Sequence, residues 1–327
     1  MYTRRQFGEL ALGALPAMAF AAKIKSKVKG LSLGMQSYTF YSAYTPSTLP
    51  TDILDTMINS MVENGLGTVD IYNGMIEPKE LVAAARGGMG RGRGAGGGTP
   101  QGGPPQVGSP QGAPPQGGGP RGGAGGRSSE AREALNKWRK EAPKSFFEDI
   151  RQKFTKAGIE VWATSGYSGQ SEEELDRAFE MSQLMGAKMV VVMGGNAELL
   201  KTVAQKRDML VGLSGPTRTP QGYVEALNAS KNFRAALDIG DTTPSGFDSL
   251  SFVRENPEKI GLLYLKDKKK TGASVPWGDG DSRVAEILRL VRDKKYPIRC
   301  MVDNDYPTTT NRSDDVKRSI DWVKKTL

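Results

Sequence analysis

The chain of 327 residues contains no histidine and only one cysteine. The missing histidine removes the usual base that activates a cysteine nucleophile, and Cys300 has apolar neighbours, so Cys300 is predicted to be a buried strand residue. One cysteine also excludes a disulfide within the chain, which is compatible with export when the core is large. The hydrophobic fraction of 37% is low because a Gly- and Pro-rich tract dilutes it.

The N-terminal residues lack an apolar run long enough to cross a bilayer. The segment from Leu10 to Phe20 follows the basic start Thr3-Arg4-Arg5-Gln6-Phe7 and precedes a small residue, Ala21. This pattern predicts an export signal over residues 1–21 of the twin-arginine type, while Gly8-Glu9 departs from that type and keeps the general secretory route open. A short buried helix is the alternative. Cleavage after Ala21 would release a periplasmic protein without a stable membrane anchor.

The net charge of +9 does not belong to the predicted folded domain. Residues 1–29 contribute about +5 and residues 86–129 about +5 more, which leaves the remaining residues near −1. A nucleic-acid partner is expected where basic residues cluster on a folded surface. The charge therefore gives no reason to expect nucleic acid as a partner.

Residues 86–129 are dominated by Gly, Pro, Gln and Ser, with imperfect Pro-Gln-Gly repeats and few apolar side chains. Such a segment cannot bury a core. Because both flanks carry folded patterns, residues 87–128 are predicted to be a disordered insertion within one domain, 30–327, after its second strand. The Arg-Gly dipeptides of the insertion suit RNA or acidic polysaccharide, but a solvated loop is the simpler interpretation.

Elsewhere, short apolar or β-branched runs alternate with amphipathic helical patterns, which is typical of parallel βα units. Eight such units predict an α/β fold of the (β/α)8 TIM-barrel class. An open doubly wound sheet is the alternative, disfavoured because no Gly-x-Gly-x-x-Gly turn follows the first strand. The predicted strands are Leu31–Ser37, Thr68–Tyr72, Glu160–Thr164, Lys188–Met193, Met209–Leu213, Phe233–Asp238, Gly261–Tyr264 and Ile298–Asp303. The predicted helices are Thr51–Glu63, Phe146–Ala157, Glu172–Met185, Glu198–Gln205, Gln221–Asn228, Leu250–Glu255, Arg283–Asp293 and Asp314–Lys325, and the predicted N-caps are Thr51, Ser171, Ser282 and Ser313.

Polar residues gather at the predicted carboxyl ends of the strands, where TIM barrels carry their chemistry. Each of these residues alone has a simple alternative role as a cap of a helix or turn. Their joint occurrence on one rim predicts a site. The rim residues are Asp70, Asn73, Glu77, Asp238, Lys266, Asp267, Asp303 and Asp305.

Two motifs in the second half are the most specific ones, Leu265-Lys266-Asp267-Lys268-Lys269 and Val275-Pro276-Trp277-Gly278-Asp279-Gly280-Asp281, with weaker support from Gly34-Met35-Gln36-Ser37-Tyr38-Thr39-Phe40. With these motifs and its leader, the chain resembles exported bacterial members of the sugar phosphate isomerase/epimerase family with the xylose isomerase-like TIM barrel. The resemblance covers most of Leu31–Leu327 outside the insertion. In that family, Glu, Asp, His and Glu from strands five to eight typically hold a divalent metal. Carboxylates move a proton between adjacent carbons through an enediolate.

The resemblance implies a degenerate metal site. Asp238 matches the strand-six ligand, and Asp303 stands, one methylene shorter, in the place of the strand-eight glutamate. Tyr264 occupies the strand-seven histidine position, Asp241 replaces a further histidine, and residues 209–214 offer no carboxylate for strand five. An all-oxygen metal site of Asp238, Asp241 and Asp303, with Asp305 as a further candidate, would suit Mn²⁺, Mg²⁺ or Ca²⁺ better than Zn²⁺. The alternative is that no metal binds.

Two functions follow from these residues. The first is an exported isomerase or epimerase acting on a small sugar or polyol, with Asp238 and Asp303 as catalytic carboxylates. The second is a barrel that has lost catalysis and binds carbohydrate; retention of Asp238 and the two motifs narrowly favours the first. Lys268, Lys269 and Lys270 are expected to be solvated, and for Trp277 packing under the seventh loop is the alternative. A homo-oligomer is compatible with either function. The predicted substrate-binding residues are Lys266, Tyr264, Trp277, Asp70 and Glu77.

Overall fold

The computed structural model describes residues 23–44, 48–86, 124–167, 171–215, 217, 219–307 and 311–327. The predicted export signal over residues 1–21 lies outside them, as do residues 87–123 of the predicted insertion, so both stay predictions. Within the described part, no helix is long and apolar enough to span a membrane.

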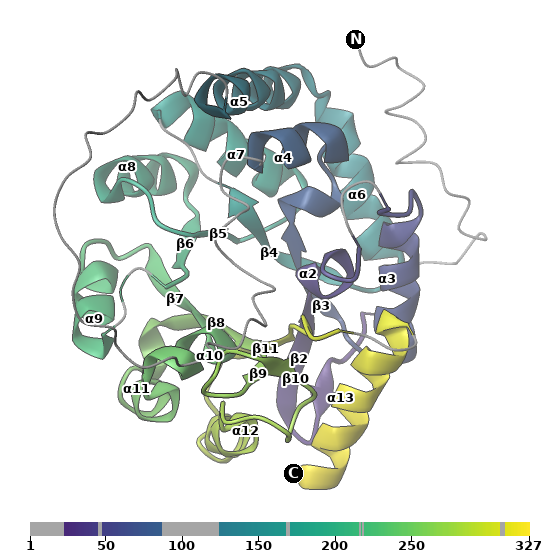
Figure 1. Ribbon diagram of the computed structural model, residues 1–327, viewed down its shortest axis with the longest axis vertical. Helices are drawn as coiled ribbons and strands as arrows, with labels where there is room; N and C mark the ends of the chain where they lie inside the picture. Colours follow the sequence, from purple (N-terminus) through teal and green to yellow (C-terminus); the bar gives the residue numbers. More distant parts are fainter. Residues whose placement is uncertain are drawn as a thin grey trace, which may run out of the picture.

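In the described residues, eight parallel strands form a closed ring (Figure 1). The sheet runs in the order β2-β11-β8-β7-β6-β5-β4-β3, and pairing of β2 with β3 closes it. This confirms the predicted barrel and excludes the open sheet. The barrel strands are β2 (Leu31–Gln36), β3 (Thr68–Tyr72), β4 (Glu160–Tyr167), β5 (Met189–Val192), β6 (Leu210–Leu213), β7 (Phe233–Asp238), β8 (Ile260–Leu265) and β11 (Arg299–Val302). Cys300 lies buried in β11, as predicted.

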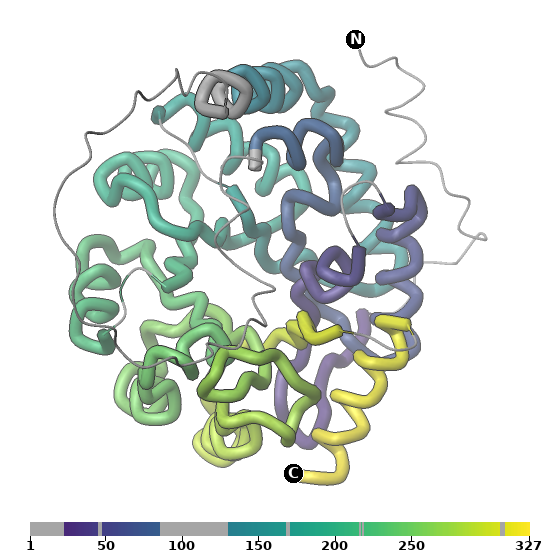
Figure 2. The backbone as a smooth tube through the Cα atoms, in the orientation of Figure 1, coloured from purple at the N-terminus to yellow at the C-terminus, as the bar shows by residue number. Residues whose placement is uncertain are grey.

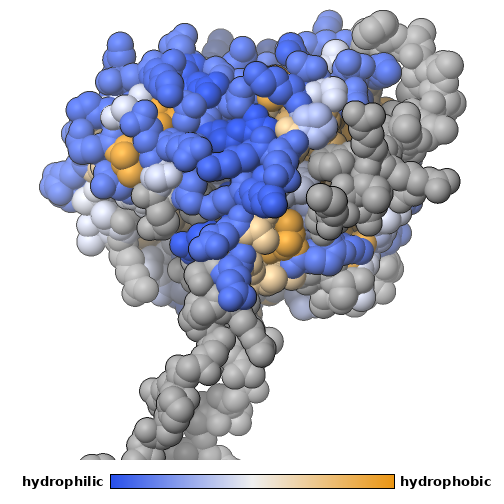
Figure 3. Space-filling view, turned by 90° about the horizontal axis from the view of Figure 1, so that it is seen from above, coloured by the Kyte–Doolittle hydropathy of each residue, from blue (hydrophilic) through white to orange (hydrophobic). Residues whose placement is uncertain are grey.

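Helices surround the ring, and the first and last described parts of the chain lie side by side where it closes (Figure 2). Besides the one-turn helices, two helices were not predicted, α4 (Lys79–Arg86) and α5 (Ala124–Glu141), which pack against each other. The predicted helices appear as α3 (Ile53–Glu63), α6 (Lys144–Lys156), α7 (Glu172–Leu184), α8 (Ala197–Arg207), α9 (Pro220–Asn228), α11 (Ser249–Glu255), α12 (Val284–Asp293) and α13 (Arg312–Thr326). Seen from the side that carries α5, most of the described surface is hydrophilic (Figure 3).

Of the predicted N-caps, Ser171 is confirmed, since its side chain accepts a hydrogen bond from the Glu174 N–H. The other three are wrong. Residue Asp52 precedes α3 in place of Thr51, and Ser313 lies inside α13, whose N-cap is Asn311. The cap position of α12 is Arg283, while the Ser282 hydroxyl accepts a hydrogen bond from the Lys268 N–H.

Short elements decorate the barrel. Strand β1 pairs in antiparallel fashion with the amino end of β2, and β9 and β10 form a hairpin directly after β8. Their bounds are β1 (Lys27–Val28), β9 (Asp267–Lys268), β10 (Ser274–Val275), α2 (Tyr38–Tyr41), α10 (Ile239–Thr242), η1 (Asn73–Met75), η2 (Thr243–Ser245) and η3 (Pro257–Lys259).

Alternation along the strands sorts their side chains into two sets. On β8, Leu263 and Leu265 belong to the main core under the helices, whereas Leu262 and Tyr264 belong to a separate cluster inside the barrel, together with Met301. Successive side chains of a strand point to opposite faces. The next inward residue of each strand therefore stands at the carboxyl end of the barrel.

Candidate active site

Three polar residues continue the inner face of the barrel past the strand ends. Lys266 follows the inward Tyr264 by two residues, and Asp238 and Asp303 follow inward residues of β7 and β11 by the same step. Strand β8 lies between β7 and β11 in the ring. The strand order therefore places residue 266 between the two aspartates, and the direction of its side chain decides whether the ammonium reaches their carboxylates.

The Nζ atom of Lys266 lies 2.8 Å from Oδ2 of Asp238, 3.2 Å from Oδ2 of Asp303 and 3.6 Å from Oδ2 of Asp305. The side chain of Lys266 is 9% exposed and that of Asp303 is 4% exposed. Water screens charges at such depth much less than at the surface. We call these four residues the rim cluster.

Asp238 is fixed from two sides. Its Oδ1 accepts hydrogen bonds from the backbone N–H groups of Gly240 and Asp241, both at 3.0 Å, as the N-cap of α10, while Oδ2 accepts one from Lys266. A side chain at residue 240 would collide with Cβ of Lys266, so glycine lets α10 approach the end of β8. The backbone thus orients the Asp238 carboxylate toward the lysine.

A second ion pair lies beside the rim cluster. The Nζ of Lys268 donates to Asp241 and lies 3.8 Å from Oδ2 of Asp305. The side chain of Lys268 is only 15% exposed, so the expectation that it is solvated is wrong. The sequence contains a signal for this pair. Lys268 follows Lys266 by two residues, and in an extended chain side chains two residues apart point to the same face.

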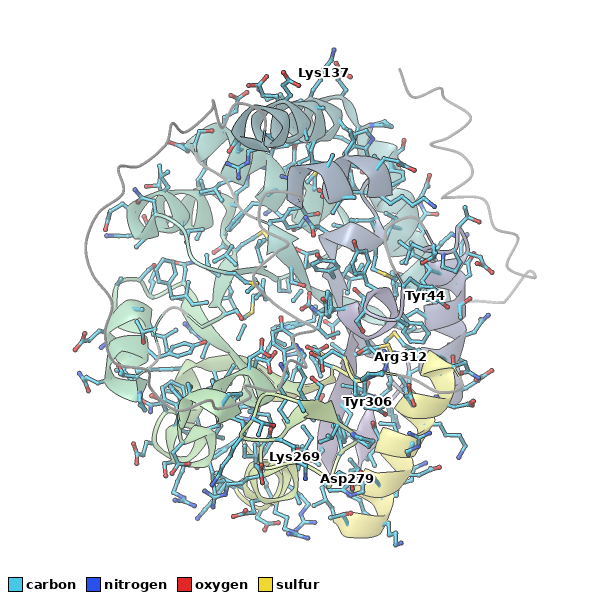
Figure 4. All side chains as sticks on the ribbon, viewed as in Figure 1. Tyr44, Lys137, Lys269, Asp279, Tyr306 and Arg312 are labelled. Atoms are coloured by element: carbon cyan, nitrogen blue, oxygen red, sulfur yellow. The ribbon has the colours of Figure 1, made fainter. Side chains whose placement is uncertain are left out.

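The segment that follows β11 is anchored by Arg312. Nη1 of Arg312 donates to the Tyr306 carbonyl at 3.0 Å and to Asp315 at 3.2 Å. Tyr306 and Arg312 lie next to each other at the start of α13 (Figure 4). Asp303 and Asp305 therefore stand on a segment that is held at the strand end and again at the helix.

Burial governs the protonation of the rim cluster. It raises the pKa of Asp303 to about 8 in spite of the attraction of Lys266, and it also raises the pKa of Asp238. Burial disfavours the Lys266 ammonium, but the attraction of Asp238 and Asp303 outweighs it and holds the lysine pKa well above its usual range. Because two carboxylates share one ammonium, Asp303 takes up a proton near neutral pH while Lys266 stays charged.

One step deeper in the barrel, the Tyr264 hydroxyl donates to Oδ2 of Asp70 at 2.6 Å, with both residues buried. Burial raises the pKa of Asp70 to about 7, against hydrogen bonds from Tyr264 and Ser165. Gln36, the neighbour of Asp70 on β2, donates to the Ser165 hydroxyl at 2.9 Å. The sequence analysis did not predict Gln36 and Ser165 as site residues. Their place near the carboxyl ends of β2 and β4 is the signal that could have found them.

Two predicted substrate-binding residues are engaged elsewhere. The Glu77 carboxylate is buried and accepts two hydrogen bonds from Arg139 of α5, at 2.7 and 2.9 Å. The Trp277 indole donates to the Leu265 carbonyl at 3.1 Å and packs edge-on against Trp322, with ring centroids 6.0 Å apart. These contacts match the packing alternative for Trp277 and give Glu77 a structural partner.

The predicted metal ligands do not fit a metal site. Among the described residues, no group of three or more His, Cys, Asp or Glu side chains is placed to hold a metal ion. The Asp241 carboxylate turns to Lys268, and the Lys266 ammonium stands between Asp238 and Asp303. The three predicted metal ligands are therefore already paired with lysine ammonium groups of the protein.

The closed barrel is shared with solved structures. The probable 3-DHS dehydratase AsbF from Bacillus anthracis has a TM-score of 0.57 at 12% identity, covering 90% of this chain and 98% of that one. A xylose isomerase domain protein from Alicyclobacillus acidocaldarius has a TM-score of 0.52 at 13% identity, covering 90% and 98%. The chain has the xylose isomerase-like TIM-barrel fold.

A D-allulose 3-epimerase from Methylomonas sp. has the same fold, with a TM-score of 0.54 at 9% identity, covering 95% of this chain and 100% of that one. A scan of protein-family models and a search of the curated proteins found no match to this chain. At these identities, the likeness of this xylose isomerase-like barrel to the solved structures is one of fold.

The buried pair of Glu77 and Arg139 generates a stability prediction. Arg139→Met should reduce the free energy of unfolding by roughly 3–5 kcal/mol, because it leaves the buried Glu77 carboxylate without a counter-ion and with only the hydrogen bond from Asn73. The double variant Arg139→Met/Glu77→Gln should recover most of that loss. Urea unfolding of the three proteins checks this, and a loss in the single variant that the double variant does not relieve would contradict it.

Asp70 generates a prediction about pH. Its folded pKa of about 7 exceeds the ordinary value of 3.8, so the folded state holds the proton more tightly and stability falls as pH rises between these values. Asp70→Asn removes this penalty and keeps an acceptor for Tyr264. Relative to wild type, the variant should gain up to about 4 kcal/mol between about pH 4 and about pH 8. Urea unfolding at both pH values measures this; an equal effect at both would contradict it.

Proposed function

We propose that this protein is a sugar isomerase/epimerase-like enzyme that moves a proton between adjacent carbons of a small sugar or polyol at the rim cluster. The observation that carries the proposal is the environment of Asp303. Its Oδ2 faces Lys266, whereas its Oδ1 is buried without a hydrogen-bond partner among the described residues. Buried polar atoms are nearly always paired, so an open carboxylate oxygen beside an ammonium suits a bound molecule.

The chemistry follows from these two side chains. The carboxylate of Asp303 would accept the proton of a carbon next to the substrate carbonyl, and Lys266 would donate a hydrogen bond to the oxygen on which negative charge develops. Return of the proton from Asp303 to the neighbouring carbon gives the isomer when the hydroxyl proton on the first carbon's oxygen also passes to the former carbonyl oxygen. Return to the opposite face of the same carbon gives the epimer and requires a second acid on that face. The raised pKa of Asp303 places its two forms close to balance near neutral pH.

The epimerase and isomerase-domain names of barrels that share this fold support the proposal at the level of reaction class. The leader pattern of residues 1–21 supports a periplasmic location. The second candidate function, carbohydrate binding without catalysis, is favoured by one observation, that the described carboxylates are not arranged to hold a metal ion.

Solvent exchange tests the proposal across many sugars at once, so the substrate need not be identified first. We expect wild-type protein in D₂O to exchange a carbon-bound proton of at least one member of a panel of aldoses and ketoses, followed by NMR. Asp303→Asn should slow that exchange by roughly 10²-fold or more, the usual contribution of a general base. Asp314→Asn, an exposed change in the first turn of α13, is the matched control. Saturable binding of a sugar without any exchange would favour the non-catalytic function instead.

A further inference from the structure

We infer that Lys266 is the resident cation of the rim, occupying the place between Asp238, Asp303 and Asp305 that a divalent metal ion would need, so that the site works without a metal. The inference concerns the site of the proposed function but does not rest on any reaction there. The positive charge of the site then belongs to the Lys266 side chain and not to a bound ion.

The geometry places the ammonium at the meeting point of three carboxylates. One oxygen of each lies 2.8, 3.2 or 3.6 Å from the same Nζ atom. Hard cations such as Mg²⁺ and Ca²⁺ bind oxygens at roughly 2.0–2.6 Å. An ion among these three oxygens would therefore lie within contact distance of the ammonium, where repulsion between like charges is severe at low dielectric.

The lysine is held where it stands. Residue Gly240 brings α10 against its Cβ, and the Tyr38 ring lies near its ammonium, with Nζ 5.8 Å from the ring centroid. Backbone N–H groups fix Asp238, so the principal carboxylate cannot turn away either. A side chain enclosed in this way has little freedom to swing out and admit an ion.

Charge counting gives the same assignment. Lys266 is within 3.6 Å of all three carboxylates, whereas Lys268 is shared between Asp305 and Asp241. In addition, Oδ1 of Asp303 is buried without a partner among the described residues, so a ligand oxygen remains available. Removal of the Lys266 charge would therefore leave these carboxylate oxygens without their ammonium and allow a hard cation to take its place.

The test measures Mn²⁺ uptake in the absence of any sugar, by electron paramagnetic resonance of free Mn²⁺ and by calorimetry. Wild-type protein should show no saturable uptake that depends on Asp303. Lys266→Ala should bind Mn²⁺ at least about tenfold more tightly than wild type, a change of about 1.4 kcal/mol. Adding Asp303→Asn to Lys266→Ala should abolish the gain.

Two controls keep the result interpretable. Lys266→Arg retains the charge and should gain no Mn²⁺ binding, and Lys268→Ala removes the neighbouring ammonium and should gain less than Lys266→Ala. If Lys266→Ala does not fold, as judged by its thermal transition, Lys266→Gln removes the charge at nearly constant size and takes its place.

Asp303-dependent Mn²⁺ binding by wild-type protein would overturn the inference, and so would a folded, charge-removed variant that gains no Mn²⁺. Because no sugar is present, inactivity toward every sugar would count against the proposed function alone.

Discussion

The carboxyl end of this barrel depends on one buried ammonium. Lys266 connects the ends of β7, β8 and β11, three strands that are neighbours in the ring, through Asp238 and Asp303. Each ion of a buried pair loses several kcal/mol of hydration, which pairing offsets only when the remaining polar atoms are also satisfied. Asp238 meets that condition with two backbone N–H groups, and Asp303 does not. The least satisfied carboxylate is therefore also the one best placed to act on a bound molecule.

The sequence predicted the barrel well because its strands are buried on both faces and separated by amphipathic helices, a pattern that has few other solutions. It also placed Asp238, Lys266 and Asp303 at one rim, because parallel strands bring their carboxyl ends together. It did not reveal that the lysine stands among the carboxylates. A carboxylate that binds a metal and one that binds an ammonium look the same in sequence, and only the direction of the Lys266 side chain distinguishes them.

Ser282 and Glu77 each have a partner distant in sequence, whereas the predicted caps Thr51 and Ser313 miss the observed ones by one and two residues. Ser171 and Ser282 each precede a helix, but Ser171 is extended and caps α7, whereas the Ser282 hydroxyl is taken by the N–H of Lys268 in the hairpin. Glu77 likewise pairs with Arg139, 62 residues away and beyond the Gly- and Pro-rich tract. Helical spacing and cap preference describe only neighbours along the chain, so tertiary partners of this kind override them.

The electrostatics and the proposed chemistry of the rim cluster have one origin. A lysine ammonium has three N–H donors. Asp238 holds one at 2.8 Å, and Asp303 competes for another at 3.2 Å. An oxygen of a bound molecule gains that donor most easily when Asp303 is protonated, because the competing charge is then gone. Burial raises the pKa of Asp303 to about 8, so the protonated form is well populated near neutral pH. In the proposed reaction, Asp303 loses its charge when it takes the proton of the substrate carbon, and this releases a donor of Lys266 at the moment when negative charge develops on the substrate oxygen.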